Sequence, residues 1–98
     1  MITKTDLQKM IRVVADINHD MTPRTAFFMF SGHIEGASIQ VYPAGWKTSH
    51  SVYTSFDIVN NADLQYMHKT VENGEILKEP VEYMTLDDVL KAVKEVRI

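Results

Sequence analysis

Apolar residues recur at helical spacing near both ends of the chain and alternate with polar residues in its middle. Near the N-terminus the spacing predicts a helix over residues 6–17, with a buried stripe made of Leu7, Met10, Ile11, Val14 and Ile17. Thr5-Asp-Leu-Gln8 has the form of a capping box for its start. Near the C-terminus Thr85 is the predicted N-cap of another helix, whose stripe is Leu86, Val89, Leu90, Val93 and Val96.

Two strand-like runs, 25–31 and 34–42, flank Gly32-His33, a pair that can close a two-residue β-turn. This turn would place Phe28 opposite Ala37, and Ala26 opposite Ile39. Phe30 would then lie opposite Glu35. One sheet face would collect most of the aliphatic and aromatic side chains, and the other would carry Phe27, Met29, Ser31, Ile34, Ser38, Gln40 and Tyr42.

A third strand is predicted where apolar and polar residues alternate over 52–58. The next segment, 61–74, has two interpretations. Its apolar positions fit a helical stripe, but Asn73-Gly74 could equally close a second hairpin. The hairpin would set Glu72 opposite Glu75, and like charges directly across a strand pair are unfavourable, so the helix is favoured.

These elements predict an α+β fold: a three-stranded antiparallel meander with an N-terminal helix and two C-terminal helices. The 98 residues, 45% of them hydrophobic, suit a single domain over residues 1–98. Strands about 4.8 Å apart and helices about 10 Å wide leave room for only two helices on one face of such a sheet. The third helix would pack outside the others or cover the second face, and if nothing covers that face it marks a partner site.

Acidic residues concentrate in the second half of the chain, although the net charge is only −3. Between residues 72 and 88 there is one Lys, Lys78, against the acidic residues Glu72, Glu75, Glu79, Glu82, Asp87 and Asp88. This acidic strip is either a solvated surface that aids solubility or a patch complementary to a basic partner. Direct nucleic-acid binding is not expected, because phosphate contacts require a basic face.

No catalytic or cofactor chemistry is predicted. The chain has no Cys and four His, none of them in a metal-ligand spacing, so neither a metal nor another cofactor is expected. Ser49-His50-Ser51 places a hydroxyl beside an imidazole, but neighbouring side chains on a strand point to opposite faces. We therefore expect a protein that is not an enzyme. The sequence contains no cysteine, no recognisable export signal and no membrane span, and we therefore expect a cytoplasmic protein.

Trp46 is the most informative single residue for binding. On a surface loop beside Tyr42 and Tyr53 it would offer a large, stiff contact; alternatively, the loop folds back and the indole closes one end of the core. An alternative function is a small ligand-binding or minor enzymatic domain with a pocket near His33, Glu35 and Trp46.

In size, element order and three short runs, the chain resembles small accessory proteins of phages and prophages. The runs are Phe27 to Ile34, Ile39 to Tyr42, and Gly45-Trp46. Some proteins of that kind are anti-CRISPR or other anti-defence inhibitors. The resemblance implies a stoichiometric binder that blocks a host protein, with acidic side chains where nucleic acid would otherwise lie. It assigns no functional residue.

The sequence therefore predicts a small protein-binding module, which the resemblance would make a phage-encoded inhibitor of a host defence protein. A homodimer is its simplest version, because exposed strand edges and apolar faces are often covered by a second copy. The predicted contact residues are Phe27, Met29, Tyr42, Trp46, Tyr53, Glu72, Glu75, Glu79 and Glu82.

Overall fold

The computed structural model describes residues 2–31, 36–45, 52–61, 63–72, 74–77 and 79–96. Within these ranges it contains two helices and six strands, in the order α1 (Lys4–His19), β1 (Thr25–Ser31), β2 (Gly36–Tyr42), β3 (Val52–Asn61), β4 (Asp63–Glu72), β5 (Glu75–Ile76), β6 (Val81–Tyr83) and α2 (Leu86–Glu95). The strands form one antiparallel sheet, ordered β1-β2-β3-β4-β5, with β6 also paired to β4. The predicted α+β class is confirmed, whereas the predicted three strands and three helices are wrong.

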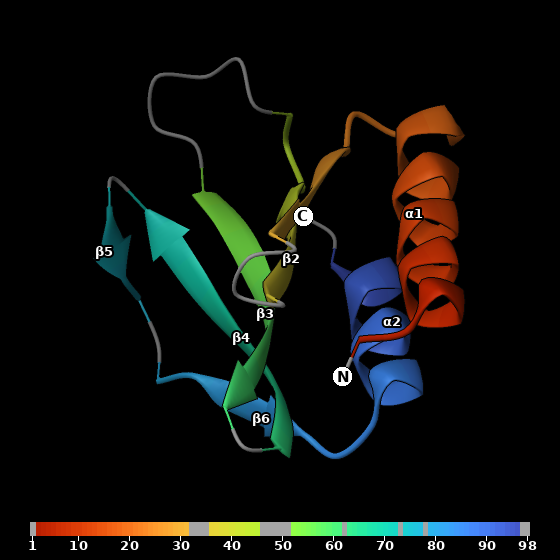
Figure 1. Ribbon diagram of the computed structural model, residues 1–98. Coiled ribbons are helices and arrows are strands. Elements are labelled where there is room, and N and C mark those ends of the chain that lie inside the picture. The colour runs from red at the N-terminus through yellow and green to blue at the C-terminus, as the bar shows by residue number, and fades with distance from the viewer. Residues whose placement is uncertain are drawn as a thin grey trace.

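Both helices lie on the same side of the sheet (Figure 1). The core fills the space between them and the sheet, and its fully buried side chains include Met10 and Val93 from the helices and Ile39, Val41 and Phe56 from the strands. Burying a side chain of this size stabilises the folded state by about 1.5–3 kcal/mol, so this layer supplies the main stabilisation of the fold.

Helix α1 begins two residues earlier than predicted. The hydroxyl of Thr3 accepts the Asp6 N–H at 3.1 Å, and the Asp6 carboxylate accepts the Thr3 N–H at 3.0 Å. The capping box is therefore Thr3 to Asp6, and the predicted box at Thr5 to Gln8 is wrong. Ile2, directly before this cap, is buried in the core. The C-terminal helix starts as predicted, with Thr85 accepting the Asp88 N–H.

The first hairpin forms, but its register differs from the prediction by two residues. Phe28 lies opposite Ile39, and Ser31 lies opposite Gly36. A two-residue turn at Gly32-His33 would instead pair Ser31 with Ile34, so the predicted register is wrong. Residues 32–35 lie outside the described ranges. Because a shift of two residues keeps every side chain on its side of the sheet, the predicted division between the two faces is confirmed for the described residues of both strands; Ile34 and Glu35 lie outside them.

Residues 63–72 form strand β4, so the predicted helix over 61–74 is wrong. β4 pairs along its whole length with β3, from Asn61 opposite Asp63 to Val52 opposite Glu72. Gly74 has a φ of +81°, and β5 returns along β4 with Glu75 opposite Glu72. The hairpin that was considered unfavourable is the one that forms. The predicted third strand is confirmed and extends beyond Ile58 to Asn61.

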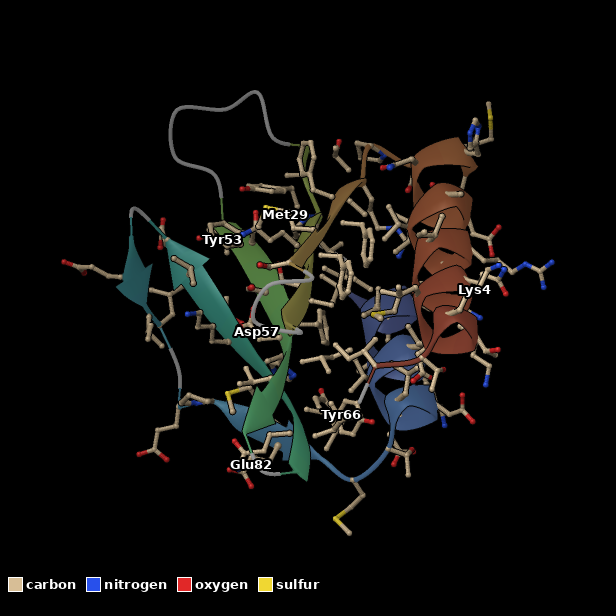
Figure 2. The ribbon with its side chains drawn as sticks, viewed as in Figure 1. Lys4, Met29, Tyr53, Asp57, Tyr66 and Glu82 are labelled. Carbon is tan, nitrogen blue, oxygen red and sulfur yellow. The ribbon has the colours of Figure 1, made fainter. Side chains whose placement is uncertain are left out.

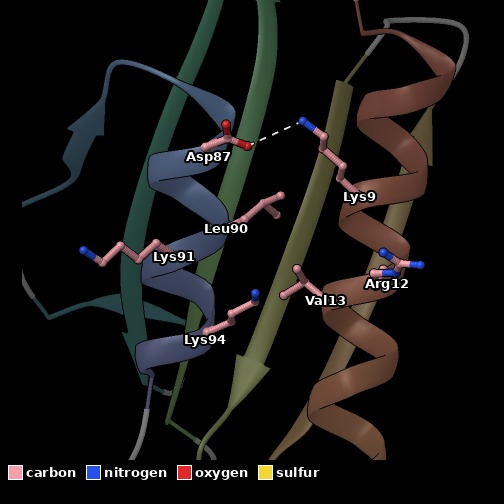
Figure 3. A pocket seen from close by; sticks show the side chains of 7 residues that line it. All are labelled: Lys9, Arg12, Val13, Asp87, Leu90, Lys91 and Lys94. Atoms are coloured by element: carbon pink, nitrogen blue, oxygen red, sulfur yellow. Dashed lines mark ion pairs between the residues drawn. The ribbon is translucent and has the colours of Figure 1, made fainter.

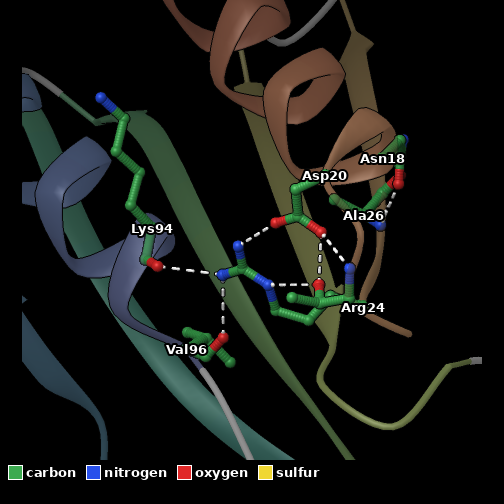
Figure 4. A network of polar contacts seen from close by, with 7 residues as sticks. Asn18, Asp20, Arg24, Ala26, Lys94 and Val96 are labelled. Atoms are coloured by element: carbon green, nitrogen blue, oxygen red, sulfur yellow. Dashed lines mark hydrogen bonds and ion pairs between the residues drawn. The ribbon is translucent and has the colours of Figure 1, made fainter.

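A buried arginine joins the two helices at one end of the molecule (Figure 4). Arg24 is only 9% exposed, and its Nη1 donates to the backbone oxygens of Lys94 at 2.9 Å and Val96 at 3.2 Å. Its Nη2 pairs with the carboxylate of Asp20, the C-cap residue of α1. Arg24 thus satisfies carbonyls at the end of α2 that have no partner within the helix.

In the described ranges, neither helix is long and apolar enough to cross a membrane.

Candidate functional site: the outer sheet face

The side of the sheet that faces away from α1 and α2 is the candidate site, and we call it the outer sheet face. Figure 2 shows Met29, Tyr53 and Asp57 on this side, whereas Tyr66 points toward the helices. The strand registers align the outer side chains in rows, such as Met29, Ser38, Asp57 and Met67 across β1 to β4. No helix or strand of the described residues covers this face.

Three aromatic rings form a continuous row on the outer sheet face. The Phe27 and Tyr42 ring centroids are 5.7 Å apart with perpendicular planes, and those of Tyr42 and Tyr53 are 4.9 Å apart. Edge-to-face and tilted contacts at these distances are favourable. Burial raises the pKa of Tyr42, and the nearby Tyr53 adds to the effect. The row is therefore a contiguous aromatic surface, with Phe27 still 39% exposed.

Beside the aromatic row lies an open depression of about 570 Å³. Its outer-face lining combines apolar and charged side chains: Met29, Ser38, Asp57, Val59, Met67 and Lys69. Met29 is 56% exposed and Val59 is 42% exposed. The Ser55 hydroxyl donates to the Asp57 carboxylate at 3.1 Å and holds it in place. The depression thus offers flexible methionines around one oriented carboxylate and one ammonium group.

This arrangement suits binding of another macromolecule. Methionine side chains adapt to irregular surfaces, aromatic rings lose little conformational entropy on contact, and isolated charges set orientation. In the part of the chain that the structure describes, no three His, Asp or Glu side chains gather into a group that could hold a metal ion.

The structure brings together four of the predicted contact residues: Phe27, Met29, Tyr42 and Tyr53 all lie on the outer sheet face. Trp46 lies outside the described residues, as do His33 and Glu35 of the alternative pocket. The sequence reasoning missed Met67, Lys69 and Val59. Met67 and Lys69 were missed because a helix was predicted over 61–74. Their alternation with Tyr66 and His68 is nevertheless typical of a strand.

The predicted acidic strip is not one surface. Glu72 and Glu75 are paired across β4 and β5, and strand alternation places Glu72 on the same sheet face as His68. Glu82 lies opposite Met67 and so belongs to the outer sheet face (Figure 2). Glu79 is exposed between β5 and β6. Of the four glutamates, Glu82 alone lies in the row that crosses the candidate site.

His68 lies in the segment where a helix over 61–74 was predicted, and it is a partly buried residue of strand β4. It lies on the helix-facing side of the sheet, where its Nδ1 contacts the Tyr83 hydroxyl and its ring is 5.2 Å from that of Phe56. Burial lowers the pKa of His68 and raises the pKa of Tyr83. Both shifts favour the neutral forms, which fits a packing role for this pair.

A basic groove runs between α1 and α2 (Figure 3). It has a volume of about 290 Å³, and the described residues that line it include one carboxylate, Asp87, among the cations Lys9, Arg12, Lys91 and Lys94. Lys9 and Asp87 form an exposed ion pair at 3.6 Å. Each helix carries two cations three residues apart, a spacing that is visible in the sequence. The two pairs lie close together only because α1 packs against α2.

No protein-family model, no curated protein and no solved structure matches this chain.

Proposed function

We propose that this protein is a small, non-enzymatic binding module that docks another protein onto its outer sheet face. The observation that supports this most strongly is the asymmetry of the sheet. One face is covered by α1 and α2, while the opposite face carries an ordered aromatic row and an open depression flanked by exposed methionine. Contiguous apolar surface of this kind on a small protein marks an interaction site.

The chemistry of the face supports a particular kind of partner. Phe27, Tyr42 and Tyr53 form the apolar anchor row, and Asp57 and Lys69 provide one charge of each sign beside the depression. Such a surface fits a protein with an apolar protrusion flanked by polar groups. It does not fit a nucleic-acid backbone, because Lys69 is the only cation among the described residues that line the depression.

The resemblance to phage accessory proteins gives this role a biological setting: an inhibitor that blocks a host defence protein by stoichiometric binding. In this setting the outer sheet face occupies the target's working surface, and Glu82, in the row of Met29 and Met67, adds negative charge at the margin of the contact.

The test is a comparison of three immobilised baits in one lysate of the source cells. Val59→Glu places a charge in the outer sheet face, at a side chain of β3 that is 42% exposed and lines the depression. Met84→Glu places the same charge at a side chain that is 88% exposed and lies between β6 and α2. We expect the wild-type and Met84→Glu baits to capture the same protein and the Val59→Glu bait to lose it. Circular dichroism must show that all three are folded. Equal capture by the folded Val59→Glu bait would reject the outer sheet face as the docking site.

A further inference from the structure

Strand β1 forms one edge of the sheet, and its composition is unusual for an exposed edge. Its seven residues contain no charge and no proline, and four of them form the run Phe27-Phe-Met-Phe30. Proteins normally protect such edges with charges, prolines or short strands, because an open edge pairs with other chains.

The opposite side of the same sheet shows that protection. Beyond β4 the sheet ends in two short strands, β5 with two residues and β6 with three. Each carries a glutamate, Glu75 or Glu82, and Pro80 directly precedes β6. The contrast between the two sides makes β1 the open edge of this fold.

Asn18 identifies which backbone groups of β1 point outward. Its side-chain Nδ2 donates to the Ala26 carbonyl at 2.8 Å, and its Oδ1 accepts the Ala26 N–H at 2.7 Å. Ala26 therefore directs both groups away from β2. Because outward and inward groups alternate along an antiparallel strand, the N–H and carbonyl of Phe28 and Phe30 also point away from β2. Within the described ranges, these four groups have no hydrogen-bond partner.

The side of α1 nearest this edge is apolar as well. Ile11 and Asn18 are seven residues apart and so lie on nearly the same side of the helix. Since Asn18 reaches the backbone of β1, Ile11 is on the side that flanks the open edge, and it is 51% exposed. Ala15 lies between them on this side and is also exposed. The open edge thus continues into an apolar strip on the helix.

We propose that two copies of this chain pair through β1, antiparallel and about a two-fold axis, to form one continuous sheet. A second copy fits because the open edge is complementary to itself. Phe28 and Phe30 together present two N–H donors and two carbonyl acceptors, and the strand has no charge that would repel the same strand of a second copy. The proposal uses the backbone edge of β1, whereas the docking proposal uses side chains of the sheet face and is tested at Val59 on β3, away from this edge. Met29 belongs to both surfaces.

The pattern of open groups also fixes the register. Pairing Phe28 with Phe30 of the partner subunit, and Phe30 with Phe28 of the partner subunit, uses all four open groups and leaves Asn18 on Ala26. A shift of two residues that paired Ala26 with Phe30 of the partner subunit would displace Asn18 from the Ala26 backbone. The two-fold axis then passes beside Met29, which faces Met29 of the partner subunit in a non-hydrogen-bonded pair. Phe30, which is 43% exposed in the single chain, is covered by Phe28 of the partner subunit.

Single cysteine variants test this register directly, because the natural chain has no cysteine. In a non-hydrogen-bonded pair the Cα atoms are about 4.5 Å apart, within the range of a disulfide. Met29→Cys should therefore form an interchain disulfide on mild oxidation. Phe27→Cys is the matched control, because the axis at Met29 separates the two copies of residue 27 by four residues along the strand, about 13 Å, which is beyond disulfide reach.

Sedimentation velocity on the uncrosslinked protein supplies the second measurement. We expect a concentration-dependent monomer–dimer equilibrium that Phe30→Lys weakens by at least about tenfold, because it brings two like charges together across the axis. Met84→Lys, at an exposed side chain away from this edge, should leave the equilibrium unchanged. A protein that stays monomeric at every concentration, or one that crosslinks as readily through Phe27→Cys as through Met29→Cys, would overturn the proposal. Failure here would leave the lysate capture test unaffected.

Discussion

Arg24 should contribute much more to stability than an exposed arginine such as Arg12, and Arg24→Met tests this. The methionine keeps most of the buried aliphatic stem but removes the guanidinium. The variant therefore loses the charged donor to the Lys94 and Val96 carbonyls and leaves those carbonyls without their partner. Hydrogen bonds to charged groups contribute about 1.5–3 kcal/mol each, and here one nitrogen serves both oxygens. We expect a loss of about 3 kcal/mol in the free energy of unfolding.

The assay is urea denaturation followed by circular dichroism, with the midpoint compared at an unchanged slope. For a domain of this size, a loss of about 3 kcal/mol corresponds to a fall in melting temperature of about 12–24 °C. Arg12→Met is the control, because Arg12 is exposed on α1 and should change stability by no more than about 0.5 kcal/mol. If Arg24→Met is no more destabilising than Arg12→Met, Arg24 does not fasten the end of α2 in the way described.

Two smaller predictions concern charged groups. Hydrogen bonds from Thr22 and Arg24 lower the pKa of Asp20 from its ordinary value of 3.8 to about 2. Its stabilising effect is therefore complete above pH 3.8 and lost as the pH falls toward 2. Acid unfolding of Asp20→Asn should lack this component, and an unchanged acid profile would contradict the assignment. Separately, Glu75→Lys should stabilise the protein by about 0.2–1 kcal/mol, because it replaces a like-charge pair with Glu72 by an attractive one. Glu79→Lys, outside the strands, should have no such effect on the melting temperature.

The two terminal helices could be predicted because their signals are local. Apolar spacing and the Thr85 cap suffice for α2, since neither depends on distant partners. The start of α1 was harder to predict, because Thr3 and Thr5 both begin a capping pattern. The structure uses Thr3, and the burial of the preceding Ile2 is a tertiary contact that the local pattern does not show.

The strand β4 could not be predicted in the same way. Leu64, Met67, His68 and Val71 fit a helical stripe, and the like-charge pair of Glu72 and Glu75 argued against a hairpin. That penalty is at most about 1 kcal/mol. The continuous pairing of β4 with β3 outweighs it, but this stabilisation is invisible in the sequence of the segment itself.

The outer sheet face was predicted in part. A hairpin register that was wrong by two residues still sorted Phe27, Met29 and Tyr42 correctly, because side chains alternate with a period of two. The depression could not be predicted, since Met67 and Lys69 reach it only when β4 is a strand.

The most direct test of the docking proposal is the methyl spectrum of the protein with labelled methionines, recorded alone and with the captured partner at fixed protein concentration. The chain carries a methionine reporter in each relevant place: Met29 and Met67 on the outer sheet face, Met10 in the core, and Met21 and Met84 fully or nearly fully exposed elsewhere. We expect the Met29 and Met67 signals to change on binding while those of Met21 and Met84 stay in place. Changes at Met21 or Met84, with Met29 and Met67 unaffected, would contradict the account.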